Sequence, residues 1–146
     1  MTAERGYNLT IPLSNIDIDI PIVFADRGIV ATSLTSGLRI GGWAEYAHPS
    51  RPANPHYFNS ISRISQDLFP GLNIENANYW IGSRPSTPYS VPVISKSLKI
   101  DIVFYNCGHG HYGLTHAATS ANLLCSLIEG EQNSAEIKAF SIDRFL

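Results

Sequence analysis

The sequence predicts an α+β fold: mainly an antiparallel sheet with a covering helix, followed by a carboxy-terminal strand, glycine loop and helix. Three observations support this prediction. Apolar residues alternate with polar ones over the first 45 residues. Apolar residues then recur at spacings of three and four between residues 57 and 68. A largely apolar run over residues 100–106 leads into three closely spaced glycines. The first pattern is typical of half-buried strands and the second of an amphipathic helix.

The amino-terminal segment alternates from Tyr7 to Trp43 and is interrupted by Pro12, Pro21 and Asp26-Arg27-Gly28. Such breaks between alternating runs indicate short connections, so we expect a meander of antiparallel strands that includes residues 16–20. Gly28 suits a tight turn because glycine accepts positive φ without a steric penalty. Arg39 alternates with apolar neighbours and is expected to face solvent.

The predicted helix ends at Pro70-Gly71, where proline cannot continue it and glycine favours a reversal. The chain is expected to be extended again over residues 74–83. Arg84-Pro85-Ser86-Thr87-Pro88 follows, and its two prolines predict a rigid extended loop. In such a loop the Arg84 guanidinium could be held for a bidentate grip on a carboxylate. The alternative is an exposed arginine paired with a surface acid.

The largely apolar run Ile100 to Asn106 predicts a strand that is buried on both faces. Gly108-x-Gly110-x-x-Gly113 follows it and is expected to open a helix. We expect one face of that helix to carry Leu114, Ala117, Ala118, Ala121, Leu124, Cys125 and Ile128. The glycine spacing resembles a dinucleotide fingerprint, but no later strand carries the acidic residue which that fingerprint requires. A plain tight turn, or a partial site touching a cofactor held elsewhere, are the alternatives.

Composition excludes several functional classes. The 146 residues are 44% hydrophobic and 15% charged, with a net charge of −2, so one compact domain of ordinary composition is expected. No basic stripe is present to bind nucleic acid. No apolar run reaches the roughly 20 residues of a transmembrane helix. The two cysteines lack a paired spacing, and we expect them to be reduced in a cytoplasmic protein, with peripheral association with the inner membrane as an alternative.

Four potential metal ligands, Cys107, His109, His111 and His116, lie within ten residues. Thiolate and imidazole groups suit zinc, but no recognised ligand spacing occurs among them. We therefore assign no metal site, and a small metal-binding module remains the least favoured hypothesis. A histidine in a glycine turn more often hydrogen-bonds a ligand or the backbone. Tyr112 is a candidate pocket residue because of its position in this turn.

Several segments together resemble the carboxy-terminal third of the amino-acid oxidoreductase family that includes D-amino-acid dehydrogenases, glycine oxidases and opine oxidases. The matching segments are Glu4-Arg5-Gly6-Tyr7, residues 37–42, residues 68–72, residues 80–88, residues 108–115 and Asp143-Arg144-Phe145. Their order and spacing match the family along nearly the whole chain. Glu4-Arg5-Gly6-Tyr7 and Gly108-His109-Gly110-His111 look most like the D-amino-acid dehydrogenase branch.

The resemblance implies a protein in which a Rossmann-type half binds FAD and an antiparallel sheet covers the flavin. Residues 1–99 would form the substrate-side region, and residues 100–146 would return to the FAD-binding domain. The substrate-binding residues implied by the resemblance are Arg84, which would grip the substrate carboxylate, His111 and Tyr112. The implied cofactor-binding residues are Arg84, Pro85, Gly108, His109, Gly110, His111, Tyr112, Gly113, Leu114 and Thr115. No residue is assigned a catalytic role.

The implied reaction is oxidative deamination of a D-amino acid or related amine to a 2-oxo acid and ammonia. FAD is expected to bind only with a complementary FAD-binding half supplied by a partner chain, so the chain alone is expected to be inactive. Tyr89 and Ser95 stand where the family usually has an acidic residue and a glycine, which suggests relaxed selection. The alternative is therefore a truncated, non-catalytic remnant of such an enzyme.

Overall fold

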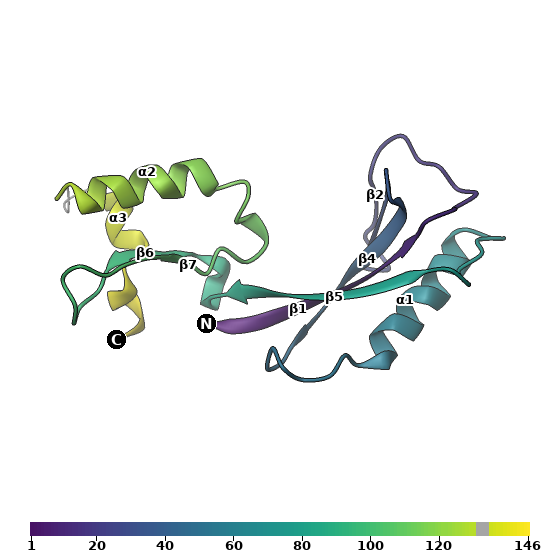
Figure 1. The fold of residues 1–146 in the computed structure, drawn as a ribbon, viewed down its shortest axis with the longest axis horizontal. Helices are drawn as coiled ribbons and strands as arrows, with labels where there is room; N and C mark the ends of the chain where they lie inside the picture. The colour runs from purple at the N-terminus through teal and green to yellow at the C-terminus, as the bar shows by residue number, and fades with distance from the viewer. Residues whose placement is uncertain (131–134) are drawn as a thin grey trace. The chain divides into compact units, whose positions relative to one another are not determined.

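The computed structural model describes residues 1–130 and 135–146 (Figure 1). The strands are β1 (Thr2–Ile11), β2 (Ile22–Phe24), β3 (Ile29–Leu34), β4 (Gly37–Tyr46), β5 (Asn78–Ser86), β6 (Val93–Lys96) and β7 (Phe104–Cys107). The helices are α1 (Pro55–Leu68), α2 (Ala117–Ile128) and α3 (Ala135–Ala139), with 3-10 turns η1 (Pro88–Ser90), η2 (Gly110–Tyr112) and η3 (Ile142–Phe145). The strands form a five-stranded sheet in the order β2-β3-β4-β1-β5 and a two-stranded sheet of β6 and β7. The α+β prediction is confirmed.

Two compact units divide the chain. Arg5–Ser83 forms one, here called the sheet unit, and Met1–Glu4 together with Arg84–Leu146 forms the other, here called the hairpin unit. Two strands are divided between the units. The first three residues of β1 and the last three residues of β5 belong to the hairpin unit, and the rest of each strand belongs to the sheet unit. The sequence predicted a boundary between residues 99 and 100, where the chain would return to a FAD-binding domain. The division into two units does not test that boundary, which stays a prediction.

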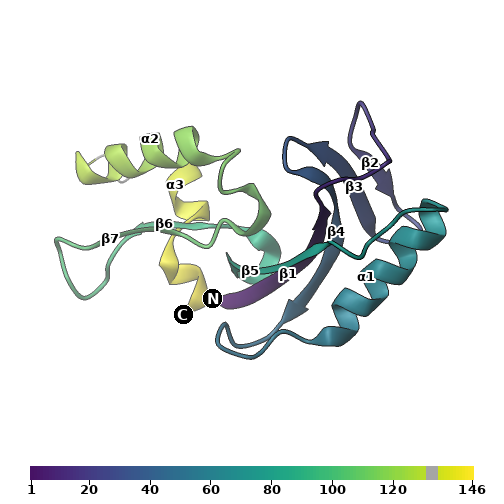
Figure 2. The same cartoon turned by 45° about the vertical axis from the view of Figure 1, so that its right-hand side comes forward.

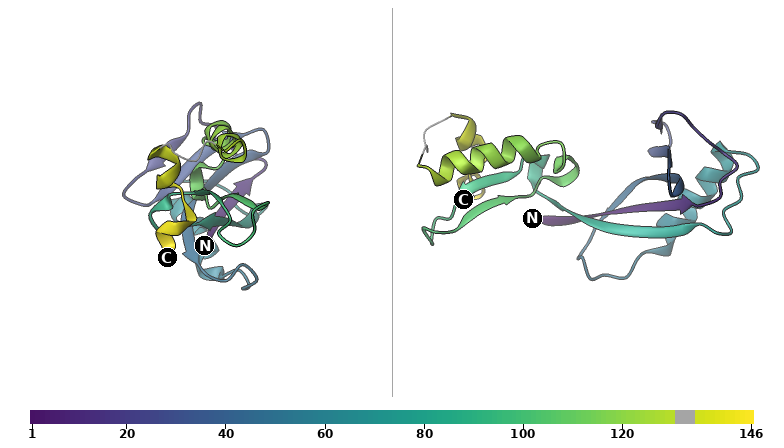
Figure 3. Two further views of the ribbon diagram at one scale, coloured as in Figure 1. Left: turned by 90° about the vertical axis from the view of Figure 1, so that its left-hand side faces the viewer. Right: turned by 45° about the horizontal axis from the view of Figure 1, so that its top comes forward.

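In the hairpin unit, β6 and β7 pair antiparallel, with Val93 opposite Cys107 and Lys96 opposite Phe104. Helix α2 runs along this hairpin (Figure 3), and its Leu127 packs with Ile94 and Ile137 in a small core. Phe104, Leu123, Leu124 and Phe140 border that core. The predicted order of strand, glycine loop and helix is therefore confirmed as β7, residues 108–113 and α2.

The predicted strand over residues 100–106 is wrong in its first half. β7 begins only at Phe104, and Ile100 and Ile102 lie in the hairpin loop with 54% and 88% of their surface exposed. The Ser97 hydroxyl accepts hydrogen bonds from the backbone N–H groups of Lys99 and Ile100. These bonds stabilise a turn, because a local side chain satisfies backbone groups that a strand would otherwise pair. β7 is also only half-buried, not buried on both faces.

The apolar face expected for α2 is mostly not the side that packs on the hairpin. Ser120 and Leu127 are the buried residues of the helix, and it begins at Ala117. Most of the expected face is exposed: Leu114, Ala117, Ala118, Ala121, Cys125 and Ile128. Apolar side chains occur on more than one side of this helix, so the sequence pattern does not determine which side packs on the hairpin. An apolar face of α2 consequently remains uncovered in the described residues.

In the sheet unit, β2, β3 and β4 form the predicted meander, with Phe24 opposite Ile29 and Leu34 opposite Gly37. The turn at Gly28 has the expected positive φ of 64°. β1 departs from a simple meander because it lies next to β4 rather than β2. Arg39 is exposed as predicted, and its Nε donates to the Thr10 hydroxyl.

The expected strand over residues 16–20 is not formed. Hydroxyl groups take the place of a neighbouring strand there, because Ser14 Oγ accepts from the Ile16 N–H and Ser33 Oγ accepts from the Ile18 N–H. Ile16 and Ile18 still pack against the core of the sheet unit. The alternating pattern of this segment therefore reflects side-chain burial without strand pairing.

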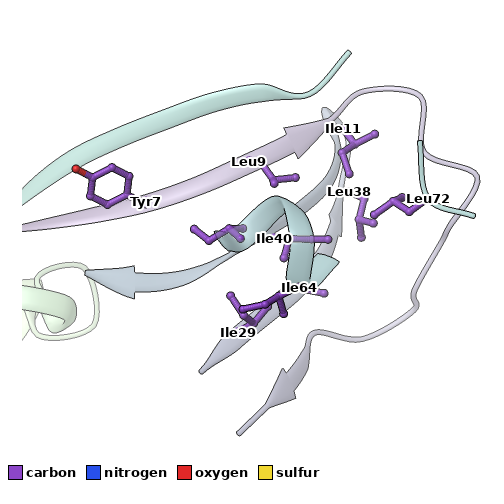
Figure 4. Close-up of a cluster of buried hydrophobic side chains, with 10 residues drawn as sticks. Tyr7, Leu9, Ile11, Ile29, Leu38, Ile40, Ile64 and Leu72 are labelled. Atoms are coloured by element: carbon purple, nitrogen blue, oxygen red, sulfur yellow. The ribbon is translucent and has the colours of Figure 1, made fainter. Parts of the chain in front are cut away.

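Helix α1 covers one face of the sheet (Figure 2). Its start is fixed by Asn54, whose side chain accepts from the His56 N–H, and by Pro55 in the first turn. Its Ile61 and Ile64 pack on the apolar face of the strands (Figure 4). The core residues shared by the helix, the following loop and the sheet include Tyr7, Leu9, Ile11, Ile29, Leu38, Ile40 and Leu72. The predicted amphipathic helix is confirmed.

A buried polar network ties the start of α1 to the sheet. The Tyr7 hydroxyl donates to Glu45 Oε2 at 2.8 Å and accepts from the Asn54 N–H at 3.0 Å. Arg5 Nη1 lies 3.3 Å from the same Glu45 oxygen, and Arg51 is 3.7 Å from the other. Burial, reinforced by the Glu45 carboxylate, raises the pKa of Tyr7. The phenol is therefore a neutral donor at physiological pH.

Tyr7→Phe removes the hydroxyl while keeping the ring, so Glu45 loses a donor and the Asn54 N–H loses its acceptor. We expect the free energy of unfolding to fall by about 1–3 kcal/mol, the cost of leaving buried polar groups unsatisfied. Urea unfolding followed by circular dichroism measures this. Tyr46→Phe, at an exposed tyrosine of β4, is the matched control and should change little. Equal effects of the two substitutions would contradict the assigned role of the network.

Candidate functional site

The end of β5 lies beside the glycine loop. Ser86 forms an isolated antiparallel bridge with His109, which joins the last residues of β5 to residues 108–110. Arg84, Pro85 and Ser86 belong to the strand, so the predicted loop over residues 84–88 begins only after Ser86. Pro85 is tolerated because β5 is an edge strand of its sheet. Arg84 is thus held by regular backbone rather than by a loop.

The three glycines of the loop have different backbone roles. Gly108 has φ of 79° and Gly110 has φ of 51°, whereas Gly113 has an ordinary helical φ of −55°. A Cβ on Gly108 would lie 2.5 Å from the Thr87 side chain, and one on Gly113 would make only ordinary contact at 3.6 Å. The first two glycines are therefore required by conformation and the third is not.

The loop does not open a helix directly, which corrects the sequence expectation. η2 covers Gly110–Tyr112, residues 113–116 form a turn, and α2 begins at Ala117. Leu114 and Thr115, predicted to contact the cofactor, lie exposed in that turn. Because dipole effects decline within the first turn of a helix, the field of α2 does not act strongly on the glycines. Their conformational freedom remains the main property of the loop.

Glu4 is a functional candidate that the site prediction missed. It is 7% exposed, and its carboxylate accepts from the Ser86 hydroxyl at 2.8 Å and pairs with His111 Nε2. Burial raises the pKa of Glu4, but the hydrogen bonds from His111 and Ser86 and the charges of His111 and Arg84 outweigh burial. The pKa of Glu4 consequently lies below its ordinary value. The contact with His111 joins residues 107 positions apart, so no local sequence signal could reveal it.

The two histidines of the loop have different partners. His109 Nε2 lies 2.9 Å from the hydroxyl of Ser120, a buried residue of α2. Burial and the nearby charge of His116 lower the pKa of His109. His111 contacts Glu4 but keeps 54% of its side-chain surface exposed. Tyr112 is also more than half exposed, and its ring stacks on His116 at 5.5 Å between centroids. His109 thus anchors the loop on α2, while the side chains of His111 and Tyr112 are more than half exposed.

Arg84 is half-buried at the end of β5. No carboxylate among residues 1–130 and 135–146 lies within ion-pairing distance of its guanidinium. The alternative of a surface arginine paired with an acid therefore has no support in the described structure. Its charge acts at longer range on Glu4. Arg84 is chemically free to bind an added carboxylate.

A metal centre and a cavity elsewhere in the hairpin unit are two other candidates for a site. Within the described part of the chain, no three His, Cys, Asp or Glu side chains gather to hold a metal ion. An open cavity of about 700 Å³ in the hairpin unit is lined by residues of β6, α2 and the carboxy-terminal turns, including Lys96, Leu127 and Arg144. Neither Arg84 nor any residue of the glycine loop lines this cavity.

Tyr89 and Ser95, the two departures noted in the sequence, lie before β6 and within it. Ser90 N–H bonds to the Thr87 carbonyl, and Tyr89 occupies the third position of this turn with φ of 62° and ψ of 12°. These angles are close to a type II turn, where glycine or asparagine is preferred. Tyr89 therefore adds local strain. Ser95 is buried in β6, where its hydroxyl bonds to the neighbouring Lys96 carbonyl.

Gly108→Ala and Gly113→Ala test the unequal roles of the glycines. The first should lower the free energy of unfolding by about 1–2 kcal/mol or more, because alanine is disfavoured at positive φ and its Cβ collides with Thr87. The second should stay within about 0.5 kcal/mol of the wild type. Urea unfolding curves of the two variants provide the comparison. A Gly113→Ala effect as large as that of Gly108→Ala would refute this assignment.

Comparison with protein families gives a match over most of the chain. The model of the family described as FAD dependent oxidoreductase matches residues 1–127. No described helix is long and apolar enough to cross a membrane.

Solved structures share the fold. Glycine oxidase from Geobacillus kaustophilus has a TM-score of 0.73 at 21% identity over 99% of this chain and 39% of its own. L-proline dehydrogenase from P. horikoshii has a TM-score of 0.74 at 18% identity over 99% of this chain and 40% of its own. Iminodiacetate oxidase from Chelativorans sp. BNC1 has a TM-score of 0.68 at 16% identity, covering 95% and 39%. The chain thus spans about 40% of the length of these structures, and it belongs to the family of FAD-dependent oxidoreductases.

Proposed function

We propose that this chain is the substrate-binding and flavin-edge portion of an oxidoreductase that oxidatively deaminates D-amino acids or related amines to 2-oxo acids and ammonia. The observation that carries the proposal is the free, half-buried guanidinium of Arg84 in the unit that also contains the glycine loop. A bidentate arginine is suited to a substrate carboxylate. Glycine, L-proline and iminodiacetate, named for the similar structures, all carry one.

The glycine loop fits a flavin edge. Gly108 and Gly110 have positive φ, so the loop takes a shape that residues with a side chain rarely adopt. We assign the cofactor contacts to Arg84, Pro85 and residues 108–115, with His111 and Tyr112 also facing the substrate. The flavin, when bound, accepts the hydride from the substrate. The protein residues bind and orient the substrate and exclude water.

The adenine dinucleotide requires a further FAD-binding segment, on the same polypeptide or on a partner chain. In this proposal, residues 1–99 shape the substrate side and residues 100–146 return to the FAD-binding domain. The uncovered apolar face of α2 supports this arrangement, since apolar helix surface normally packs against another element. We place the assembled enzyme in amino-acid catabolism in the cytoplasm, where it could also associate with the inner membrane.

A non-catalytic remnant is the second candidate, and the strained Tyr89 favours it. The turn that follows Arg84 carries a tyrosine at a position suited to glycine or asparagine. An active enzyme would gain by losing this strain, whereas a remnant is under no such selection. Flavin binding separates the two candidates.

The test combines the chain with a FAD-binding half from a similar oxidoreductase and follows flavin absorbance after addition of D-alanine. A bound-flavin spectrum that bleaches with D-alanine supports the enzyme. Failure to bind flavin under all conditions supports the remnant instead.

Arg84→Ala should raise the KM for D-alanine by about tenfold to 100-fold, because a charge-assisted pair contributes about 1.5–3 kcal/mol. The KM of Arg84→Lys for D-alanine should lie between those of the wild type and Arg84→Ala, since lysine keeps the charge but loses the bidentate geometry. Exposed Arg63 of α1 provides the control Arg63→Ala. Reduction by isopropylamine, which lacks a carboxylate, should be unaffected by the Arg84 substitutions. An unchanged KM for D-alanine would remove Arg84 from substrate binding.

A further inference from the structure

Glu4 and His111 form a carboxylate–imidazole pair in the hairpin unit. Glu4 is held on β1 and its second oxygen is occupied by the Ser86 hydroxyl at 2.8 Å. His111 Nε2 contacts the other oxygen. Both partners of Glu4 therefore fix the orientation of its carboxylate, which in turn fixes the imidazole ring. Among the described residues, His111 is the only histidine that pairs with an acid.

The chemistry of the pair defines the tautomer. The pKa of Glu4 is lowered, so the carboxylate is ionised at neutral pH and can only accept hydrogen bonds. His111 Nε2 must then carry the hydrogen. In the neutral ring this leaves a lone pair on Nδ1. No described residue hydrogen-bonds to that nitrogen, and the side chain is more than half exposed.

None of the other charged groups near Glu4 combines a carboxylate partner with an exposed ring nitrogen. Arg84 acts on Glu4 and strengthens its ionised form. His109 is engaged with Ser120, and burial together with His116 lowers its pKa. His116 stacks on Tyr112 at the start of α2. His111 is thus the imidazole in this loop that has both a carboxylate partner and an accessible free nitrogen.

We propose that Glu4 is a positioning residue that holds His111 with Nδ1 directed to the substrate, where it accepts a proton from the substrate ammonium group. One N–H bond of the ammonium breaks and an Nδ1–H bond forms. The products are a neutral amine with a free electron pair and an imidazolium paired with the Glu4 carboxylate. The free pair is what the nitrogen needs to form the imine as hydride leaves the neighbouring carbon. This inference rests on the proposed function.

The pairing itself is tested without any activity, by ¹⁵N NMR of the imidazole rings in this chain near pH 8, with His111→Asn used for assignment. We expect a protonated Nε2 and an unprotonated Nδ1 in the wild type. Glu4→Gln should mix the two tautomers, while Glu75→Gln, at an exposed acid, should not. A wild-type ring protonated on Nδ1 would overturn the proposal even if Glu4→Gln failed to fold.

The proton transfer is tested in the assembled flavoenzyme by stopped-flow reduction with D-alanine between pH 5 and 9. His111→Asn should slow flavin reduction at neutral pH by about 100-fold or more, the usual contribution of a general base. The residual rate should rise with pH, because the ammonium group of D-alanine must then lose its proton to water. Glu4→Gln should reduce the rate of flavin reduction more than it raises the KM for D-alanine. Flavin reduction by His111→Asn at the wild-type rate and with the wild-type pH profile would overturn this inference alone. A wild-type flavin that D-alanine does not reduce would overturn the proposed function, and the proton transfer with it.

Discussion

Two buried carboxylates impose the main constraint on this structure. Glu4 and Glu45 are each less than one-tenth exposed, and a charge in such a place is stable only when it is paired and hydrogen-bonded. Glu45 has Arg5 and the Tyr7 hydroxyl in the sheet unit. Glu4 has Ser86 and His111 in the hairpin unit. Removing one partner of such a group would leave a buried charge uncompensated, so each set of partners must be kept together.

Four consecutive residues of strand β1 include one buried carboxylate, Glu4, and two partners of the other, Arg5 and Tyr7. Glu4 belongs to the hairpin unit, and Arg5 and Tyr7 belong to the sheet unit. Within the sheet unit the strand lies beside β4, and Tyr7 reaches the residue that caps α1. Within the hairpin unit it brings a carboxylate to the glycine loop. The segment Glu4-Arg5-Gly6-Tyr7 therefore has a structural explanation in addition to its family resemblance.

Sequence reasoning predicted the parts of the fold that local periodicity determines. Helix α1 and the β2-β3-β4 meander follow from apolar spacing and from their proline and glycine boundaries. The start of β7 could not be predicted, because an apolar run has no periodicity and the Ser97 hydroxyl decides where the turn lies. The packed side of α2 was likewise undetermined by a helix with apolar residues on several sides. Glu4 escaped the site prediction since its partner is distant in sequence.

The Gly-His-Gly-His segment has a spacing like that of a dinucleotide fingerprint but a different physical cause. Positive φ at Gly108 and Gly110 changes the chain direction before and after His109. The two histidines of the segment consequently hydrogen-bond to different partners: His109 to Ser120 and His111 to Glu4. One imidazole is used to anchor the loop on α2 and the other stays accessible. Gly113, with helical φ, is not needed for this division. The first two glycines thus orient side chains, which is a separate role from cradling a phosphate.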